Sequence, residues 1–263
     1  MPLKSRKPAK RPPLESQDAS IVPAGGSRMS LVEETTHKLS FEIMAGVFEG
    51  QELLPTEEQL ITRFRVSRTV VREATKQLVS RGLVEIQHGR GVKIVDNLHK
   101  PFNQSFKLRL PNSKDRLEKL MEVRRLVEPF VARLAAMRVQ PKQLELLHDL
   151  QSRQHDNIDA AAAAEIDMEF HRALTKAAGN EVFELMLESV ADLGHESRLA
   201  TISEFGWRQA HESHAEILSA IEKRDGDAAQ IAMAKHMEMA AVDLRRHFSS
   251  SARNTKRQDR TTL

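Results

Sequence analysis

The sequence predicts a mainly α-helical protein that consists of an N-terminal winged helix-turn-helix and a C-terminal, all-helical antiparallel bundle. Two observations support this prediction. Residues 54–95 read as a short helix, a tight turn, a second helix and a small β-hairpin. From Asp115 to about Phe248 the apolar residues recur with helical spacing, and no segment alternates like a strand. The 263 residues are enough for two domains that each bury a core.

The composition is that of an ordinary soluble chain, with 40% hydrophobic and 29% charged residues. No apolar run approaches the length of a membrane span, so we expect no membrane partner. The basic N-terminus is not followed by an apolar core and therefore does not predict a secretory signal. The absence of cysteine excludes disulfides and thiolate metal sites and fits a reducing cytoplasm, where we expect the protein to act.

Basic residues gather at both ends of the chain. They are Lys4, Arg6, Lys7, Lys10 and Arg11 at the start, and Arg253, Lys256, Arg257 and Arg260 at the end. The polar composition predicts that residues 1–28 and 249–263 are disordered. Each segment is interpreted either as a solubilising tail or as a source of extra, sequence-independent attraction to phosphate. The net charge of the whole chain, +3, does not decide between the two interpretations.

Residues 29–96 are predicted to form the winged domain. Its expected helices cover 31–48, 57–64 and 67–81, and its strands cover 83–87 and 92–95. The first helix is amphipathic, with apolar positions that include Leu31, Leu39, Ile43 and Val47. Thr56 with Gln59 is a capping-box signature for the second helix, and Ser67 is a suitable N-cap for the third. Glu49-Gly50 and Gly82 are expected to end the first and third helices.

The start of the third helix carries the residues that would contact DNA. In a helix-turn-helix, the second helix of the motif lies in the major groove with its first residues at the base edges. Those positions are occupied by Ser67, Arg68, Thr69 and Arg72. An arginine fork can bind both acceptors of guanine or hold a phosphate. Taken alone, the two arginines could equally form a solvated basic face.

The predicted hairpin is the second candidate DNA contact. Gly89 and Gly91 allow the backbone to turn tightly, while His88 and Arg90 can extend to the minor groove or to phosphates. Helix, turn, helix and wing in this order favour DNA binding over a merely solvated basic surface. We therefore expect Ser67, Arg68, Thr69, Arg72, His88, Gly89 and Arg90 to form the DNA-binding surface.

Residues 54–95 resemble the N-terminal domain of GntR-type transcriptional regulators. The matching residues are Leu54-Pro55, Glu57, Leu60, Val66-Ser67-Arg68, Val71-Arg72-Glu73-Ala74, Leu78, Gly82-Leu83 and His88-Gly89-Arg90-Gly91. The resemblance implies a transcription factor, and we expect a homodimer that reads a short inverted repeat in double-stranded DNA.

Two positions depart from the pattern of that family. Glu58 stands where the family commonly carries an arginine that contacts phosphate, and Val70 stands where threonine or proline is common. A carboxylate repels phosphate, so we expect that contact to be lost or to be replaced by Arg63 or Arg65. The preferred operator is therefore expected to differ from the usual half-site.

Residues 97–114 contain two prolines and no helical period, which predicts a linker. Apolar residues in this segment suggest that it packs on another part of the protein. They are Phe102, Phe106, Leu108 and Leu110. Residues 115–248 are predicted to form six helices. The expected breaks are Gln140-Pro141, Asn157–Asp159, Gly179-Asn180, Ser203–Gly206 and Asp225-Gly-Asp227.

Several polar residues fall on the apolar faces of these helices. In the first helix, Arg124 and Glu128 lie one turn apart, which indicates either an internal salt bridge or an arginine that faces a cavity and binds an anion. Asp167 and His171 are also one turn apart, and His214 and His236 lie on two further apolar faces. Imidazole and carboxylate suit Zn²⁺, Ni²⁺ or Mn²⁺. The alternatives are satisfied core histidines, and His195 and His211 are rival ligands by spacing alone.

Residues 115–248 resemble the all-helical FCD effector domain of the FadR-like branch of GntR regulators. The matching motifs are Glu122-Val-Arg-Arg-Leu-Val-Glu-Pro129, Leu134-Ala-Ala136, Asp167-x-x-Phe-His171, Gly179-Asn180, His214 with Ile217-Leu218-x-Ala-Ile221, and Asp225-Gly-Asp227 with His236. The resemblance implies that Asp167, His171, His214 and His236 bind a divalent metal ion. It also implies that a small carboxylate effector lies over the metal and that Arg124 helps to hold it.

The sequence is therefore interpreted as a ligand-responsive transcription regulator, most simply a repressor controlled by a sugar acid, hydroxy acid or dicarboxylate. One alternative is a regulator of the same branch that responds to an acyl thioester, although the complete metal quartet argues against it. A metal-dependent enzyme is a further alternative with little support, because no base in a recognisable motif accompanies the quartet.

Overall fold

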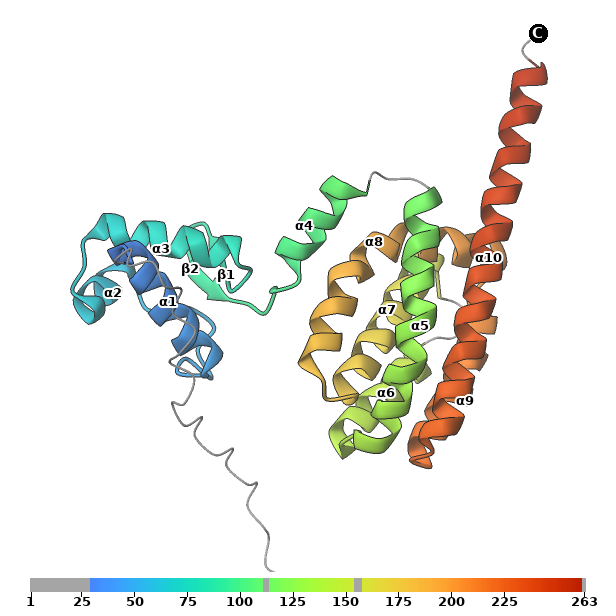
Figure 1. Cartoon of the computed structure of the whole chain (residues 1–263), viewed down its shortest axis with the longest axis horizontal. Helices are drawn as coiled ribbons and strands as arrows, with labels where there is room; N and C mark the ends of the chain where they lie inside the picture. The colour runs from blue at the N-terminus through green and yellow to red at the C-terminus, as the bar shows by residue number, and fades with distance from the viewer. Residues whose placement is uncertain (1–28, 111–113, 154–157, 262–263) are drawn as a thin grey trace, which may run out of the picture.

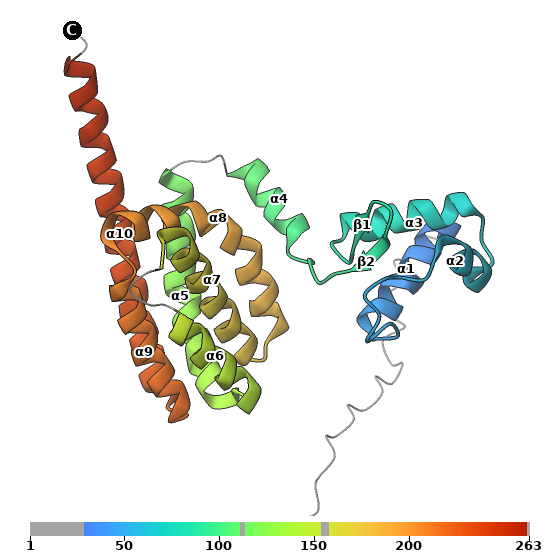
Figure 2. The same ribbon diagram turned by 180° about the vertical axis from the view of Figure 1, so that it is seen from behind.

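The computed structural model describes residues 29–110, 114–153 and 158–261. In this part of the chain the protein is mostly helical, with one two-stranded antiparallel hairpin, which confirms the predicted fold class. Figures 1 and 2 show a small N-terminal lobe and a larger helical lobe joined through helix α4. No described helix is both long and apolar enough to cross a membrane. The expected disordered arm, residues 1–28, lies outside the described residues.

The N-terminal lobe is a winged helix-turn-helix. Its elements are α1 (Leu31–Met44), α2 (Glu57–Phe64), α3 (Arg68–Ser80), β1 (Val84–Gln87) and β2 (Gly91–Ile94). The two strands pair in antiparallel register, with Val84 opposite Ile94. The core lies between the three helices and the base of the hairpin, and it contains Leu39, Phe48, Leu54, Leu60, Val71, Leu78, Leu83 and Val84.

The helix starts in this lobe follow the predicted caps. The Thr56 side chain accepts a hydrogen bond from the Gln59 backbone N–H, and the Gln59 side chain accepts one from the Thr56 backbone N–H. Ser67 caps α3 by accepting a hydrogen bond from the Val70 backbone N–H at 3.3 Å. Because these bonds satisfy N–H groups that have no partner within their helix, they fix where the helix-turn-helix begins and turns.

Helix α1 is shorter than the sequence predicted. It ends at Met44 rather than Phe48, and Gly46 with φ of 73° turns the chain away. Leu39 is fully buried as expected, but the exposed fractions of Leu31 and Val47 are 61% and 51%. The early glycine at a left-handed position ends the helix before Val47 can join its apolar face.

Residues 97–114 contain a helix that the sequence did not predict. Helix α4 covers Lys100–Arg109 and packs against α8, which agrees with the expectation that this segment packs on another part of the protein. Pro101 stands in the first turn of α4, where its missing N–H is not needed. The proline that was interpreted as a helix breaker therefore begins one. Asn103 is the buried residue of this helix.

The C-terminal lobe consists of six helices within the described residues. They are α5 (Lys114–Arg138), α6 (Pro141–Arg153), α7 (Ala160–Ala177), α8 (Glu181–Phe205), α9 (Arg208–Glu222) and α10 (Gly226–Thr261). Four of the breaks between them fall where the sequence predicted, and Asn157 of the expected break Asn157–Asp159 lies outside the described residues. Helix α10 runs on to Thr261, so the expectation of a disordered tail over residues 249–263 is wrong for most of that segment.

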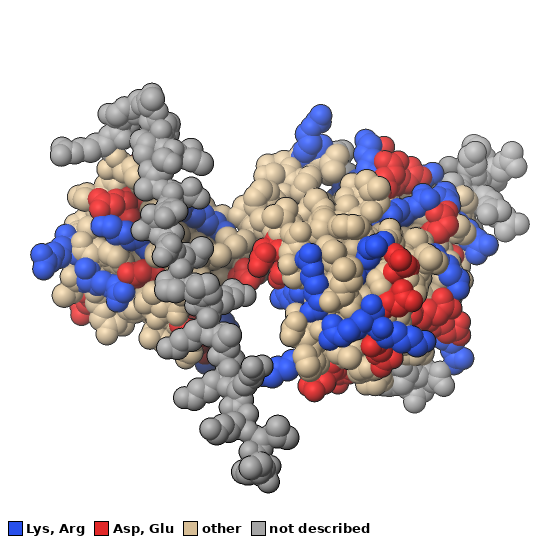
Figure 3. Space-filling view, turned by 60° about the horizontal axis from the view of Figure 1, so that its bottom comes forward, with Lys and Arg blue, Asp and Glu red and all other residues tan. Residues whose placement is uncertain are grey.

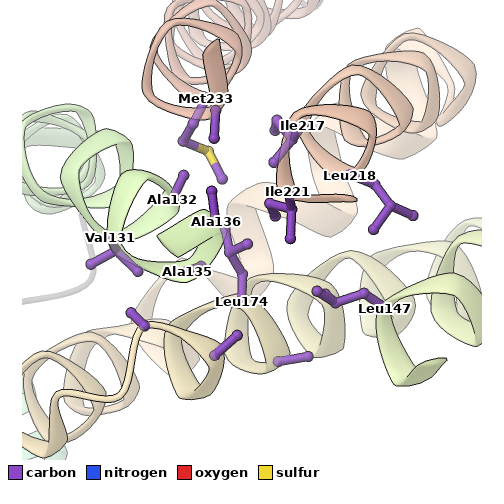
Figure 4. Close-up of a cluster of buried hydrophobic side chains, with 14 of the residues drawn as sticks. Val131, Ala132, Ala135, Ala136, Leu147, Leu174, Ile217, Leu218, Ile221 and Met233 are labelled. Carbon is purple, nitrogen blue, oxygen red and sulfur yellow. The ribbon is translucent and has the colours of Figure 1, made fainter. Parts of the chain in front are cut away.

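The main core of this lobe lies where α5, α6, α7, α9 and α10 meet (Figure 4). Small residues of α5, such as Ala132, Ala135 and Ala136, let the neighbouring helices approach closely. Leu147, Leu174, Ile221 and Met233 fill the space between these helices and are fully buried. Burial of a leucine or isoleucine side chain of this kind contributes about 1.5–3 kcal/mol. The packing holds α7, α9 and α10 side by side.

Candidate nucleic-acid interface and candidate metal centre

The start of α3 presents the four predicted DNA-contacting residues to solvent. Ser67, Arg68, Thr69 and Arg72 are exposed, while Val71, one residue before Arg72, is buried in the core of the lobe. Figure 3 shows basic and acidic side chains mixed on both lobes of the face that it displays. On that face DNA would therefore be attracted by individual arginines and not by a large field of one sign.

The two predicted base-contacting arginines are tethered by one carboxylate. Glu57 of α2 contacts Arg68 Nε through Oε1 and Arg72 Nε through Oε2, each at 3.0 Å. Glu58 Oε1 lies 3.7 Å from Arg68 Nη2. The residue that departs from the family pattern thus faces the first arginine of the recognition helix. This pairing was not expected from the sequence, because it joins two helices across the turn.

The two residues expected to replace the lost phosphate contact differ in their surroundings. Arg63 donates a hydrogen bond to Glu42 Oε1 at 2.9 Å and lies over the ring of Phe48, so it is engaged within the lobe. Arg65 is exposed at the turn, with φ of 55°. Of the two, Arg65 has the freer position.

The tip of the wing is exposed and sharply turned. His88, Gly89 and Arg90 are exposed, and Gly89 has φ of 76°. The Arg90 backbone N–H donates to Gln87 O at 3.0 Å, which closes the turn between β1 and β2. The wing thus has the form that the sequence predicted, with the His88 and Arg90 side chains accessible for contact with a duplex.

In the helical lobe, three helices bring together the four predicted metal ligands. Asp167 and His171 come from α7, His214 from α9 and His236 from α10, and one ligand atom of each lies within 4.8 Å of the others. All four are buried. His171 Nε2 is 3.3 Å from His236 Nε2, and His214 Nε2 is 3.4 Å from Asp167 Oδ1. Ring nitrogens and a carboxylate oxygen thus converge on one small space.

The quartet is held by charged residues around it. Glu128 Oε2 lies 2.5 Å from His171 Nδ1, and Glu128 Oε1 accepts a hydrogen bond from Arg124 Nε at 2.5 Å. Arg198 of α8 donates through Nε to Asp167 Oδ2 at 2.6 Å. A carboxylate on one ring nitrogen of histidine orients the ring and leaves the other nitrogen for a metal. The Glu128 contact therefore directs His171 Nε2 into the cluster.

The protonation states of Asp167, His214 and His236 are set by burial and by neighbouring charges. Burial, with help from the charge of His171, lowers the pKa of His236 to about 3. Burial is also the largest cause that lowers the pKa of His214. Burial by itself would raise the pKa of Asp167, but Arg198 and the three histidines hold it below its ordinary value. Neutral imidazoles and an ionised carboxylate are the forms that bind metal ions.

These residues fit a divalent metal ion. His214 Nε2 is buried and makes no hydrogen bond, which is unusual for a polar atom in a protein interior. Three imidazoles with one carboxylate are a donor set that suits Zn²⁺, Ni²⁺ or Mn²⁺. The described residues therefore contain a buried Asp/His cluster that could hold such an ion.

The two rival histidines lie outside the cluster. His195 Nε2 pairs with Glu165 Oε1 at 2.8 Å, and its side chain is 35% exposed. His211 lies 3.3 Å from the Gln151 amide through Nε2 and packs edge-on against Trp207. Spacing along the sequence did not distinguish them from the quartet, because only the crossing of α7, α9 and α10 decides which helix faces meet.

Two pockets lie against the cluster. The larger has an empty volume of about 660 Å³, including its open mouth, and is lined by Asp167, His236 and the apolar side chain of Met121. The second is lined by Glu128, His171 and residues of α8. Arg124 and Arg198 line both pockets. Arg124 thus makes the predicted salt bridge with Glu128 and also faces a cavity, while its binding of an anion stays a prediction.

Arg198 and the His171 contact of Glu128 were missed by the sequence analysis. A signal for Arg198 was present, since Val190, Gly194, Arg198 and Ile202 recur every four residues on the inner face of α8 and all are buried. A charged residue on such a stripe calls for a partner. The Glu128–His171 contact had no comparable signal, because it joins residues of α5 and α7, and a whole helix, α6, lies between these two along the sequence.

Known proteins resemble the chain over both lobes. Residues 31–94 match the family of bacterial regulatory proteins named gntR, and residues 119–239 match the FCD domain. The chain is 30% identical over 226 residues to the Uxu operon regulator of Haemophilus influenzae, which covers 78% of this chain and 79% of that protein. It is 28% identical over 199 residues to the galactonate operon transcriptional repressor of Escherichia coli, covering 73% and 87% of the two chains. The solved structure of Streptococcus agalactiae GntR matches with a TM-score of 0.61 and 30% identity, over 80% of this chain and 98% of that one.

Removal of metal should make the helical lobe sensitive to mild acid. The pKa of His236 is about 3 in the folded protein, whereas an unfolded histidine titrates near 6.5. Between these values the unfolded state binds the extra proton, so stability falls as the pH falls. In excess chelator, lowering the pH from 7 to 5 should decrease the free energy of unfolding by about 2 kcal/mol from this residue.

The measurement is urea unfolding at the two pH values. His236→Gln should lose this part of the pH dependence, whereas His148→Gln, at an exposed ion pair with Glu222, should retain it. Equal pH dependence in the wild type and in His236→Gln would contradict the assignment of a buried neutral imidazole.

Proposed function

Because the chain belongs to the gntR family of bacterial regulatory proteins and carries an FCD domain, we propose that it is a sequence-specific repressor whose DNA binding is controlled by a small carboxylate. The family and its relatives are transcription regulators and not enzymes. The observation that carries the proposal is the buried Asp167, His171, His214 and His236 cluster beside a pocket lined by arginine. DNA binding by itself does not require such a cluster, whereas control by a small carboxylate does use it.

On the DNA, the proposed contacts are those of α3 and the wing. Arg68 and Arg72 would exchange the Glu57 carboxylate for base edges or phosphates when α3 enters the major groove. Ser67 and Thr69 would contact the backbone or bases beside them, and the wing tip at His88, Gly89 and Arg90 would contact the minor groove. Glu58 beside Arg68 disfavours a phosphate at that point, so the half-site is expected to differ from the family's usual one.

Two copies of the chain would read the two halves of an inverted repeat. An exposed apolar row on α5 supports a homodimer. Its members are Val123, Leu126, Phe130 and Met137, with exposed fractions of 39%, 79%, 45% and 59%. Monomeric proteins rarely leave such a contiguous row in water. Sedimentation equilibrium measures the mass directly, and a monomer at micromolar concentration would contradict this part of the proposal.

In the helical lobe, the proposed effector is a sugar acid, hydroxy acid or dicarboxylate. A relative at 28% identity is named a galactonate operon repressor, which supports this chemical class. A divalent ion held by the quartet would supply a Lewis acid for the carboxylate and hydroxyl oxygens of the effector. The chain itself would hold the acid through Arg124, shield it with Met121 and Met239, and keep His214 and His236 neutral by burial.

Helix α8 offers a route from this site to the DNA-binding lobe. Glu188 lines the same pocket as His171, and its Oε2 atom lies 3.3 Å from Nδ1 of His99, just before α4. Glu188 and His99 also line a groove between the lobes together with Met44 and Leu83. An effector that shifts α8 would therefore move His99 and α4, and we expect the signal to pass through this segment.

Substitution at the recognition helix tests DNA binding. Binding sites selected from a random duplex library should contain an inverted repeat, and titration of the labelled site should give specific binding. Arg72→Ala should weaken that binding by about 1–3 kcal/mol, since one arginine contact is lost. The control is Arg81→Ala, at the other end of the same helix, which should change it little. Sequence-independent binding, or none, would contradict the regulator.

A thermal-shift screen tests the metal-dependent effector site. Zn²⁺-loaded protein is screened against small carboxylic acids that include galactonate and lactate. A bound acid at one hundred times its Kd should stabilise the protein by about 2.7 kcal/mol. Chelator, His171→Ala and His214→Ala should each abolish the shift, whereas the control His195→Ala should not. If no acid shifts the midpoint and chelator has no effect, the quartet is a polar core, and acyl thioesters become the ligands to screen.

Loss of the Glu188 carboxylate tests the route between the lobes. Glu188→Gln should bind effector in the absence of DNA yet require at least about five-fold more of it to change operator occupancy, the lower end of usual coupling. The control is Glu216→Gln, which removes an exposed ion pair with Lys235 on another helix. Effector affinity and operator occupancy are measured separately by calorimetry and by fluorescence anisotropy. Identical effector curves for wild type and Glu188→Gln would rule this route out.

A further inference from the structure

The candidate metal cluster is flanked by two buried guanidinium groups and not by one. Arg124 comes from α5 and Arg198 from α8, and their exposed fractions are 9% and 8%. Both line the two pockets that meet at the cluster. Arginine is among the side chains least often buried to this extent, unless its charge is paired. A single bound carboxylate would account for one buried arginine but not for two from different helices.

Each arginine is fixed by a carboxylate that also touches the quartet. Arg124 pairs with Glu128, which contacts His171 Nδ1, both at 2.5 Å. Arg198 pairs with Asp167 at 2.6 Å, and Asp167 is itself one of the four converging residues. The two guanidiniums are therefore anchored next to the same small space before any ligand arrives. Pre-positioned charges of this kind lose little entropy when they bind an anion.

The formal charges of this buried group point to the charge of the ligand. Among the described residues, Arg124 and Arg198 contribute two positive charges, and Glu128 and Asp167 contribute two negative charges. With the imidazoles neutral, the form in which they bind a metal ion, the sum is zero. A divalent cation bound by the quartet would leave two positive charges uncompensated in a buried site, which is unfavourable. A ligand with one carboxylate would leave one of these positive charges uncompensated, and a ligand with two carboxylates would compensate both.

We infer that Arg198 is a second anion-binding residue of the pocket and that the effector of this protein carries two carboxylate groups. In this arrangement one carboxylate lies at the quartet beside Arg124, and the other is held by the fork of Arg198, which can bind a carboxylate through two parallel N–H donors. The inference rests on the proposed function, because it concerns the same effector site.

One acidic residue at the pocket needs to be placed in this scheme. Asp243 of α10 also lines the larger pocket, and its Oδ1 lies 3.6 Å from Nη1 of Arg246. The nearby guanidinium partly compensates its charge. The second carboxylate of the ligand is therefore expected on the Arg198 side of the pocket and away from Asp243.

Matched pairs of acids test the charge of the ligand. Galactonate and galactarate share one carbon skeleton, and galactarate carries a second carboxylate in place of the terminal hydroxymethyl group. Glycerate and tartronate form the same kind of pair at a shorter length. Calorimetric titration of Zn²⁺-loaded full-length protein should show the dicarboxylate of at least one pair binding about ten-fold or more tightly than its partner, the effect of one added charge-assisted contact.

Substitution of Arg198 tests which residue recognises the second carboxylate. Arg198→Gln should reduce the preference within the pair to about three-fold or less, and Arg198→Lys, which keeps the charge but loses the fork, should fall between. The matched control is Arg153→Gln, which removes an exposed arginine of α6 paired with Glu169 of α7, the helix that also carries Asp167, and should keep the full preference. Circular dichroism and Zn²⁺ affinity, measured for each variant, report whether the fold and the quartet are retained.

The outcomes separate this inference from the proposed function. If the monocarboxylates bind the wild type as tightly as their dicarboxylate partners, the ligand needs only one charge and the inference is wrong. If the full preference survives in folded Arg198→Gln or Arg198→Lys, the assignment of Arg198 is wrong. If no acid of either pair binds the Zn²⁺-loaded protein, the proposed function itself is contradicted and this inference falls with it.

Discussion

The need to compensate buried charge governs the helical lobe. Asp167, Glu128 and two arginines lie in an interior where an unpaired charge would destabilise the fold strongly. Each of these groups is paired, and each pair reaches the histidine cluster through a carboxylate. The pairs therefore do two things at once. They make burial of the charges tolerable, and they fix the orientation of the groups that face the pockets. The helix packing around Ala132, Ala135 and Met233 matters for function because it sets the distances between these partners.

The same principle operates at the surface of the DNA-binding lobe, with a smaller energy. Glu57 contacts both Arg68 and Arg72, and the arginine side chains of these ion pairs are more than half exposed. Exposed pairs of this kind contribute about 0–1 kcal/mol, so a phosphate or a guanine can replace the carboxylate. The contact orders the two arginine side chains but is weak enough for DNA to displace it. Glu58, at 3.7 Å from Arg68, extends this acidic edge and distinguishes the chain from the family pattern.

Much of the fold could be predicted because it depends on local signals. Capping residues such as Thr56 and Ser67 and the breaks in the helical lobe act within a few residues of themselves. The errors arose where a local signal had two meanings. Pro101 can break a helix or begin one, and only packing against α8 shows that it begins α4. In the candidate site, the converging histidines lay on recognisable apolar faces. Their separation from His195 and His211, and the contact between Glu128 and His171, depend on how helices cross, which spacing along one chain does not contain.

Helix α8 connects the candidate metal centre with the segment that leads to the DNA-binding lobe. Along this one helix, Arg198 pairs with Asp167 in the cluster, and Glu188 lies 3.3 Å from His99 at the start of the segment that leads back to the winged lobe. A helix is stiff along its axis, so a displacement at one of these residues is transmitted to the other. A ligand carboxylate bound by the Arg198 guanidinium would change the force on α8 at the end of this span that lies beside the cluster. Control of DNA binding then requires no motion within the hydrophobic core around Leu147 and Leu174, which packs α6 and α7 tightly and would resist it.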